Sequence, residues 1–312
     1  ATSSTCPSST GLMSATTPVS IEGNGSELGY YVYSGMNGEG DWRMKYSSSS
    51  TPVQHSVPGV GPMDYGTSHE CRIVGTDVQC KGSNGYGQLG NGTTTSSTST
   101  FVTVDNTDLS SAKDVSVGSD FTCALDGTGS PWCWGRGKKG RLGNGIGSNP
   151  DKATPYAVST TTVFISIESG KAHTCALTST GAIECWGDNT LGQMAEDPST
   201  QSSRKSPKIP GDITNEFAGV VFSKVSIGAE SDFTAALLDN GSIAAWGTYN
   251  GAQYNDHFVV NSGVATDVAA GKDHICYLES GAVTCVGDNS AGQTTVPTLN
   301  NPTSVHAGVD WS

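Results

Sequence analysis

The sequence of 312 residues has no apolar run that approaches the roughly 18 residues of a membrane-spanning helix. It has little charge, since Asp, Glu, Lys and Arg make up only 14% of the chain. No long stretch shows the periodicity of an amphipathic helix. Short strand-forming segments are instead separated by Gly, Asn, Ser and Pro, which predicts an all-β fold.

Familiar catalytic and cofactor-binding motifs are also missing. There is no Gly-x-Ser-x-Gly nucleophile elbow, no His-Glu-x-x-His zinc helix and no calcium loop. The string GRGKKG, from Gly135 to Gly140, has the glycine spacing of a dinucleotide fingerprint, but no helical pattern follows it as that site requires. We therefore expect no catalytic residue, no metal and no cofactor, and we predict that the protein is not an enzyme.

Basic residues are scarce, because 16 Lys and Arg stand against 29 Asp and Glu and the net charge is −13. Nucleic acid and anionic membrane surfaces are therefore unfavourable partners for the surface as a whole. The few basic residues nevertheless gather in two groups. These are Arg136, Lys138, Lys139 and Arg141, followed by Arg204, Lys205 and Lys208. They form either a basic island for an anionic partner or two solvated loops.

A repeated pattern runs through the chain. Residues 173–193 read HTCALTSTGAIECWGDNTLGQ, with two cysteines around a Gly-containing turn, then Trp-Gly and Gly-Gln. The repeat spacing, about 40 to 60 residues, is typical of propeller blades and solenoid units. The related segments are residues 69–90, 121–143, 233–253 and 274–293, with a weaker copy, YSGMNGEGDW, at 33–42.

Hairpin geometry explains the spacing of the cysteines. Cys175 and Cys185 are equidistant from Thr180, so a hairpin with a three-residue loop there places them opposite each other. Opposed Cα atoms lie about 4.5 to 5.5 Å apart, which overlaps the range of a disulfide. In one repeat Ala235 and Ala245 replace both cysteines together, as expected of a bonded pair. We predict the disulfides Cys71–Cys80, Cys123–Cys133, Cys175–Cys185 and Cys276–Cys285, with Cys6 left over.

Paired structural disulfides predict an oxidising compartment. Free buried thiols in a cytosolic protein are the alternative, and zinc is disfavoured because opposed strand positions do not make Cys-x2-Cys knuckles. The chain starts at Ala, an end that cleavage of a signal peptide would leave. We expect a secreted or cell-surface protein, in which the sequons at Asn24, Asn91 and Asn240 are candidate glycosylation sites.

Each repeat adds a preceding strand, such as DVSVGSD or KVSIGAESD, to its hairpin, and a unit this small must stack on its neighbours. The last segment, SVHAGVDWS at 304–312, matches these preceding strands and then stops. We expect the segment around Cys6 to complete that blade. The prediction is one seven-bladed β-propeller domain over residues 1–312, with degenerate repeats in 1–68, clear repeats in 69–312 and one blade shared by the two termini.

The segments CWGDNTLGQ, CKGSNGYGQLGNG and AWGTYNGAQ resemble the repeat of the regulator of chromosome condensation family. The resemblance implies a seven-bladed β-propeller. Two functions known in that family are nucleotide exchange on a small nuclear GTPase and inhibition of β-lactamases by a secreted bacterial propeller. VGDNSAGQTTVP is most similar to the secreted branch. Nuclear exchange conflicts with the paired cysteines.

Several residues recur in register, and we interpret most of them as structural. The histidines His69, His173 and His274 stand where Phe121, Phe233 and Trp311 stand in other repeats, so the position requires a packed ring and not a metal ligand. The tryptophans Trp134, Trp186 and Trp246 are expected to pack between blades. The position shared by Asn37, Asn84, Gly137, Asn189 and Asn289 is predicted to be a turn with positive φ.

An aspartate precedes the ring position in four repeats. These residues, Asp120, Asp232, Asp273 and Asp310, either make hydrogen bonds beside a bend or form a ring of carboxylates on one propeller face.

Extra residues accumulate after the Gly-Gln of successive repeats, at 91–111, 143–162 and 194–218. Insertions at one point of a repeat are expected to emerge on one face, where loops on a rigid scaffold bind partners. We predict a secreted, non-enzymatic binding module that recognises an extracellular protein or glycan, including copies of itself. The alternatives are a structural subunit of an extracellular coat, adhesin or filament, and a β-lactamase-inhibitor-like protein.

Overall fold

The computed structural model describes residues 30–33, 40–45, 54–57, 60–105, 107–147, 150–210, 221–261, 263–297 and 299–308. Within these ranges the fold is all-β, and the single helical element is a 3-10 turn, η1 (Lys138–Gly140). Six antiparallel sheets are present in this part of the chain, four with four strands and two with three.

The strands follow one another around the molecule, sheet by sheet. The sheets are β1 (Tyr30–Tyr33), β2 (Gly40–Lys45) and β3 (Gln54–Val57); β4 (Val60–Tyr65), β5 (His69–Val74), β6 (Asp77–Gly82) and β7 (Ser97–Thr103); β8 (Asp114–Val117), β9 (Phe121–Leu125), β10 (Pro131–Gly135) and β11 (Lys152–Ala157); β12 (Ser166–Ser169), β13 (His173–Leu177), β14 (Ile183–Asp188) and β15 (Ser203–Lys208); β16 (Phe222–Ser226), β17 (Phe233–Leu238), β18 (Ile243–Tyr249) and β19 (Ala252–Asn261); and β20 (Ala265–Ala270), β21 (His274–Glu279) and β22 (Ala282–Gly287).

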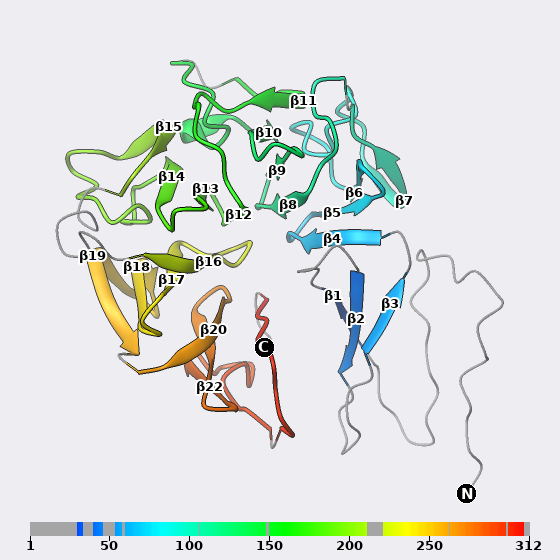
Figure 1. Ribbon diagram of the computed structural model, residues 1–312. Coiled ribbons are helices and arrows are strands. Elements are labelled where there is room, and N and C mark those ends of the chain that lie inside the picture. The colour runs from blue at the N-terminus through cyan, green and yellow to red at the C-terminus, as the bar shows by residue number, and fades with distance from the viewer. Residues whose placement is uncertain are drawn as a thin grey trace, which may run out of the picture.

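Each four-stranded sheet is a propeller blade built in chain order. An inner strand pairs with the first hairpin strand, and the second hairpin strand pairs with an outer strand. Figure 1 shows the inner strands β4, β8, β12, β16 and β20 facing the middle of the molecule, with the outer strands at the periphery. The predicted preceding strands are therefore the inner strands of the blades, and the propeller architecture is confirmed.

Inner strands of neighbouring blades are joined by hydrogen bonds from backbone N–H groups to aspartates. The Val117 N–H donates to Asp64 Oδ2 at 2.7 Å, and the Ile167 N–H donates to Asp114 Oδ2 at 3.0 Å. The Val305 N–H makes the same contact with Asp267 Oδ2 at 2.9 Å. The C-terminal segment thus lies beside β20, where the next inner strand belongs.

The count of seven blades remains a prediction. Residues 1–29, with Cys6 and Asn24, and residues 309–312, with Asp310 and Trp311, lie outside the described residues. The sharing of one blade by the two termini depends on these segments.

The predicted hairpins and disulfides are confirmed. The Thr178 N–H donates to the Ala182 carbonyl at 2.8 Å around a three-residue loop, in which Gly181 has φ +82°. Cys175 faces Cys185 across this hairpin, and the two sulfurs are bonded. The other bonded pairs are Cys71–Cys80, Cys123–Cys133 and Cys276–Cys285.

The double substitution Cys175→Ala and Cys185→Ala should leave a folded but less stable protein. One blade of this chain already carries alanines at both positions, since Ala235 faces Ala245. The disulfide closes a loop with a sequence separation of 10, so its loss should lower the free energy of unfolding by about 2 to 3 kcal/mol. Urea denaturation of the oxidised proteins measures the difference. An unchanged midpoint would contradict the role of this bond as a staple.

The hydrophobic core lies between blades and not in one central mass. Trp134, from β10, packs with Cys71, Ile73 and Leu89 of the preceding blade, and Trp246, from β18, packs with residues of the β12–β15 blade. All three repeated tryptophans are fully buried. Their predicted position between blades is confirmed.

The predicted location of the inserted segments on one face is wrong. Part of each insertion builds the outer strand of its blade, as β7, β11 and β15 show. The other described residues of the insertions precede or follow that strand and therefore lie at both ends of the blade. Because the hairpin alone leaves a sheet edge unpaired, the extra residues satisfy that edge first.

Candidate binding site on the loop face

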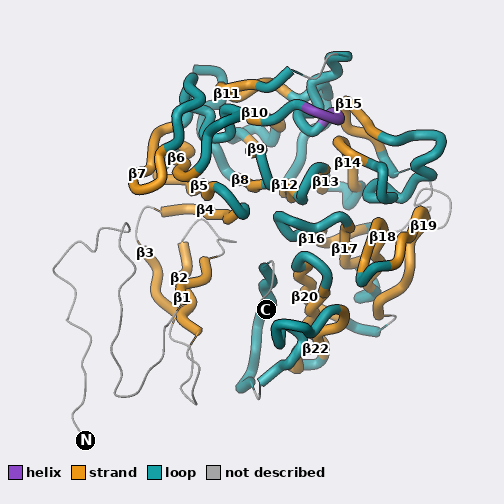
Figure 2. Tube along the Cα trace, turned by 180° about the vertical axis from the view of Figure 1, so that it is seen from behind, coloured by secondary structure: helices purple, strands orange, loops and turns teal. Residues whose placement is uncertain are grey.

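Each blade has two connections at the same end of its strands. In the β8–β11 blade these are residues 118–120, between inner strand and hairpin, and residues 136–151, between hairpin and outer strand. The two connections touch, because the Arg136 N–H donates to the Asp120 carbonyl at 2.9 Å. We call this end of the blades the loop face, and the hairpin turns lie at the opposite end. Figure 2 shows η1 among the connecting segments of this face, close to β15.

Buried amide side chains brace the long connections of the loop face. Asn84 Oδ1 accepts a hydrogen bond from the Leu89 N–H at 2.9 Å, and Asn189 Oδ1 accepts one from the Met194 N–H at 2.8 Å. Both asparagines are fully buried. The loop that they hold is therefore a fixed platform on which exposed side chains have defined positions.

The predicted positive φ at this position is wrong. Asn84, Asn189 and Asn289 are absent from the residues with positive φ, and Gly137 has φ −89°. At Asn84, Asn189 and Asn289 the side-chain amide makes hydrogen bonds, so these repeats use that bonding and not the backbone freedom that Asn shares with Gly. Gly137 has no such side chain, and its N–H donates to Asp151 Oδ1 at 2.8 Å. Asn37 lies outside the described residues.

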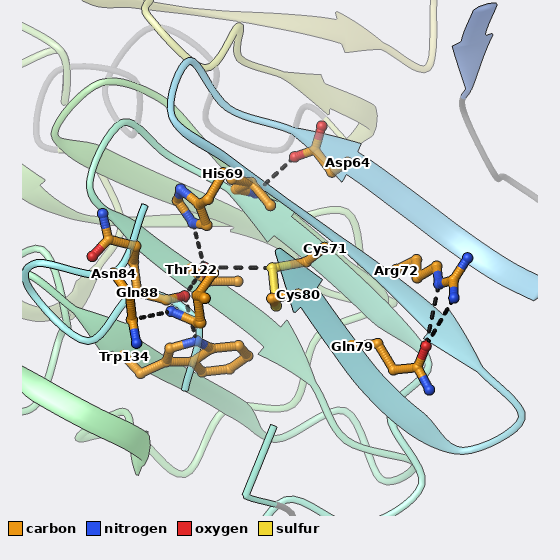
Figure 3. Close-up of a disulfide and its surroundings, with 12 residues drawn as sticks. Asp64, His69, Cys71, Arg72, Gln79, Cys80, Asn84, Gln88, Thr122 and Trp134 are labelled. Carbon is orange, nitrogen blue, oxygen red and sulfur yellow. Dashed lines mark hydrogen bonds between the residues drawn. A yellow bond between two sulfur atoms is a disulfide. The ribbon is translucent and has the colours of Figure 1, made fainter. Parts of the chain in front are cut away.

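The repeated histidines link one blade to the next. His69 Nε2 lies 2.8 Å from Thr122 Oγ1, and His173 Nε2 lies 2.9 Å from Thr234 Oγ1, in each case on the following blade. Figure 3 shows His69 beside Thr122 and the Cys71–Cys80 disulfide. Burial lowers the pKa of both histidines to about 4, so the rings are neutral near pH 7. These contacts support the structural interpretation.

The repeated aspartates do not form a bare ring of carboxylates. Asp120 pairs with Arg136 at 2.9 Å, and Asp232 pairs with Lys171 at 2.8 Å. Their backbone carbonyls also accept hydrogen bonds, from the N–H groups of Arg136 and Thr248, and the carbonyl of Asp273 accepts one from the Asp288 N–H. Asp310 lies outside the described residues. The aspartates thus both hold the turns and balance cations on the loop face.

The structure brings the two predicted basic groups together on adjacent blades. The Gly145 N–H donates to the Lys205 carbonyl at 2.7 Å, so residues 136–145 lie against β15. We call the combined set the cationic cluster. Its members are Arg136, Lys138, Lys139, Arg141, Arg204, Lys205 and Lys208.

Four members of the cationic cluster are ion-paired, contrary to the simple picture of solvated loops. Arg136 and Arg141 share Asp120, and Lys139 Nζ lies 2.8 Å from Asp188 Oδ2 of the next blade. Arg204 Nε donates to Glu196 Oε2 at 2.7 Å. The other three members, Lys138, Lys205 and Lys208, are exposed. The sequence could not show these pairs, because each carboxylate lies at least eight residues away along the chain.

Two of the sequons lie in the described part of the chain. Asn240 is exposed at the tip of the β17–β18 hairpin, where its Oδ1 accepts the Ser242 N–H at 2.9 Å. Asn91 is half-buried, and its Oδ1 accepts from Thr93 Oγ1 at 2.9 Å. Asn240 is therefore the more accessible candidate for modification.

Other site types are not supported within the described residues. No group of three or more His, Cys, Asp or Glu side chains there could hold a metal ion. In the same ranges, no helix has the length and apolarity to cross a bilayer. The GRGKKG string leads into the 3-10 turn η1 of three residues and not into a long helix.

Sequence comparison identifies repeats shared with known proteins. Two models of the regulator of chromosome condensation (RCC1) repeat match, one at residues 80–125 and 128–177, the other at residues 112–141 and 164–193. The ultraviolet-B receptor UVR8 of Arabidopsis thaliana is 30% identical over 184 residues, covering 58% of this chain and 40% of that protein. The human E3 ubiquitin-protein ligase HERC2 is 30% identical over 137 residues, covering 43% of this chain and 3% of HERC2. The chain thus spans less than half the length of these relatives.

Solved structures show the same fold at low sequence identity. Human WBSCR16 superposes with a TM-score of 0.68 and 19% identity, covering 83% of this chain and 74% of that one. Prp20p of Saccharomyces cerevisiae gives a TM-score of 0.54 and 16% identity, covering 75% of this chain and 72% of that one.

Proposed function

We propose that this chain, whose residues 80–193 match models of the RCC1 repeat, is a binding module and not an enzyme. The loop face is the binding surface, and the partner is an extracellular protein or glycan. The observation that carries the proposal is a cationic cluster that two adjacent blades bring together, on a molecule whose net charge is −13. We further propose that residues 1–312 form one propeller domain.

Protein binding is consistent with what is known of similar propellers. Prp20p, which shares the fold, binds Gsp1p and histones. A rigid propeller suits this role because specificity resides in loops whose positions the blades fix. The exposed Lys138, Lys205 and Lys208 supply a local positive field that attracts an acidic partner.

The proposal of secretion rests on the disulfides. All eight bonded cysteines belong to hairpins, and seven of them are at most 1% exposed. Disulfides of this structural kind persist in oxidising compartments and are rare in the cytosol. Glycosylation at Asn91 and Asn240 is proposed on the same premise.

The double substitution Lys138→Ser and Lys205→Ser tests the loop face. Both side chains are exposed, so each change should alter stability by no more than about 0.5 kcal/mol. Extracellular proteins of the natural source are passed over the immobilised, oxidised protein at two salt concentrations. We expect a partner that the wild type retains and that the variant binds about tenfold more weakly at low salt.

The matched control is Lys113→Ser with Lys272→Ser. These changes remove the same charge at exposed lysines outside the cationic cluster. Equal weakening by both double variants would contradict a role for this surface.

A further inference from the structure

One residue of the cationic cluster departs from a pattern that three other repeats share. In these three repeats, the side-chain oxygen of a glutamine accepts a hydrogen bond from the N–H of the residue two before it. Gln88 Oε1 accepts from the Tyr86 N–H at 2.9 Å, and Gln193 Oε1 accepts from the Leu191 N–H at 2.9 Å. The repeat at Gln293 makes the same bond to the Ala291 N–H at 2.8 Å. In the β8–β11 blade this position is Arg141.

Arg141 is a buried cation with incomplete hydrogen bonding. The residue is only 9% exposed, and its Nε and Nη1 atoms have no hydrogen-bond partner. The carboxylate of Asp120 lies 3.7 Å from Nη1, but it is already bonded to Arg136 at 2.9 Å. Burying a cation whose charge and hydrogen bonds are incompletely matched costs free energy. A glutamine at this position would cost less and would gain a hydrogen bond.

The surroundings of Arg141 also carry backbone strain and an excess of positive charge. Lys139 has φ +62°, an unfavourable conformation for a residue with a side chain. Arg136, Lys139 and Arg141 share two carboxylates, those of Asp120 and Asp188. Burial, and then the neighbouring Arg136, lower the pKa of Arg141, although the charges of Asp120 and Asp188 oppose the shift.

We propose that Arg136, Lys139 and Arg141 form the receptor for a carboxylate of an acidic protein segment. The proposal rests on the binding role assigned above to the loop face and names the chemistry of the partner. The incoming carboxylate supplies the missing negative charge and accepts from the guanidinium of Arg141, a fork whose geometry matches a carboxylate. Binding of a carboxylate then explains why Arg141 stands where other repeats have glutamine.

A protein side chain fits this site better than a sulfated glycan. The cations already hold two carboxylates of this chain, since Arg136 and Arg141 both lie near Asp120 and Lys139 pairs with Asp188. Tyr86, 37% exposed, lies under the Arg136 guanidinium at 4.6 Å from the ring centroid. Tyr and Arg together are enriched in protein–protein interfaces.

Binding of a capped, fluorescent hexaglutamate peptide tests the receptor. Its affinity is measured by fluorescence anisotropy at low salt for the wild type, for Arg141→Gln and for Lys272→Gln. The two variants lose the same charge, but Lys272 is an exposed lysine outside the cationic cluster. We expect Arg141→Gln to weaken binding about tenfold or more and Lys272→Gln to change it by less than about threefold.

A second measurement separates loss of binding from loss of fold. Arg141→Gln installs the side chain that Gln88 and Gln193 carry, so its melting temperature should equal or exceed that of the wild type. Equal weakening by the two variants, or no binding of the peptide to the wild type, would overturn the receptor. So would Arg141-dependent binding of heparin in place of the peptide. In each of these cases, the proposed binding role of the loop face would still stand if a partner bound the double variant Lys138→Ser and Lys205→Ser more weakly than the wild type.

Discussion

Gly187→Ala is expected to lower the free energy of unfolding by about 3 kcal/mol or more, enough to unfold much of the protein at 37 °C. Gly187 has φ +108°, and an added Cβ would lie 2.5 Å from the Ala172 carbonyl oxygen and 2.7 Å from His173 Cα. Both obstacles are backbone atoms of the paired strand and its turn, so neither can rotate away. The same geometry occurs at the matching glycine of four other repeats in the described part of the chain, Gly82, Gly135, Gly247 and Gly287.

Gly281→Ala is the matched control for this prediction. Gly281 has φ +77°, but no atom lies within 4 Å of the added Cβ. Its substitution should cost only the left-handed backbone penalty, about 1 kcal/mol. Denaturation of the two variants separates the contribution of φ from that of close packing. Similar losses in both would show that the contact with Ala172 and His173 is not the cause.

The sequence predicted the features that depend on neighbours along the chain. Cysteine pairing followed from the distance of Cys175 and Cys185 from a turn, and the hairpin register needed no knowledge of other blades. The Trp-Gly positions were recognised because they recur. The propeller fold was predicted on the same basis, since each repeat must bury its faces against the next.

Features that depend on contacts between distant residues were not predicted. Outer strands such as β11 carry no clear alternation, so their residues were interpreted as loops. The ion pair of Lys139 was not predicted, because its partner, Asp188, belongs to the next blade. The departure at Arg141 was visible in the alignment of the repeats, but its meaning required the hydrogen bond that Gln88 makes in the structure.

The acidic residues of the inner strands were also not singled out from the sequence. Asp114 opens β8, accepts the Ile167 N–H at 3.0 Å and thereby joins two blades. Glu168, on the adjacent inner strand, and Asp64, on the preceding one, add negative charge around it. A recurring Asp before an apolar strand, as in DVSVG and DVAAG, was the available indication.

Asp114→Asn is expected to stabilise the protein above pH 7 relative to the wild type. Burial, followed by the nearby charge of Asp64, raises the pKa of Asp114 to about 7, although its hydrogen bonds and Lys113 oppose the shift. The unfolded chain releases this proton near pH 3.8. Between these values the folded state holds more protons than the unfolded state, so stability falls as pH rises. Through this difference in pKa, the wild type loses roughly 4 kcal/mol of unfolding free energy once the pH is well above 7.

The pH dependence of the difference between the two proteins is the decisive measurement. Wild type and variant are unfolded with urea from pH 4 to pH 8. His69 and His173 act in the opposite direction, since their pKa values are lowered to about 4 and their contribution is lost as pH falls. They are present in both proteins, so the difference isolates Asp114 and the groups coupled to it.

Glu168 extends the argument to the whole row of inner carboxylates. Burial raises its pKa, and the charges of Asp64 and Asp114 raise it further, while Lys224 opposes them. Removing the charge of Asp114 should therefore lower the pKa of Glu168 and let it ionise nearer to neutral pH. The control Asp108→Asn removes an exposed carboxylate and should give a difference that hardly varies with pH. A flat difference for Asp114→Asn as well would show that its carboxyl is ionised at all these pH values and that the inner strands tolerate its charge.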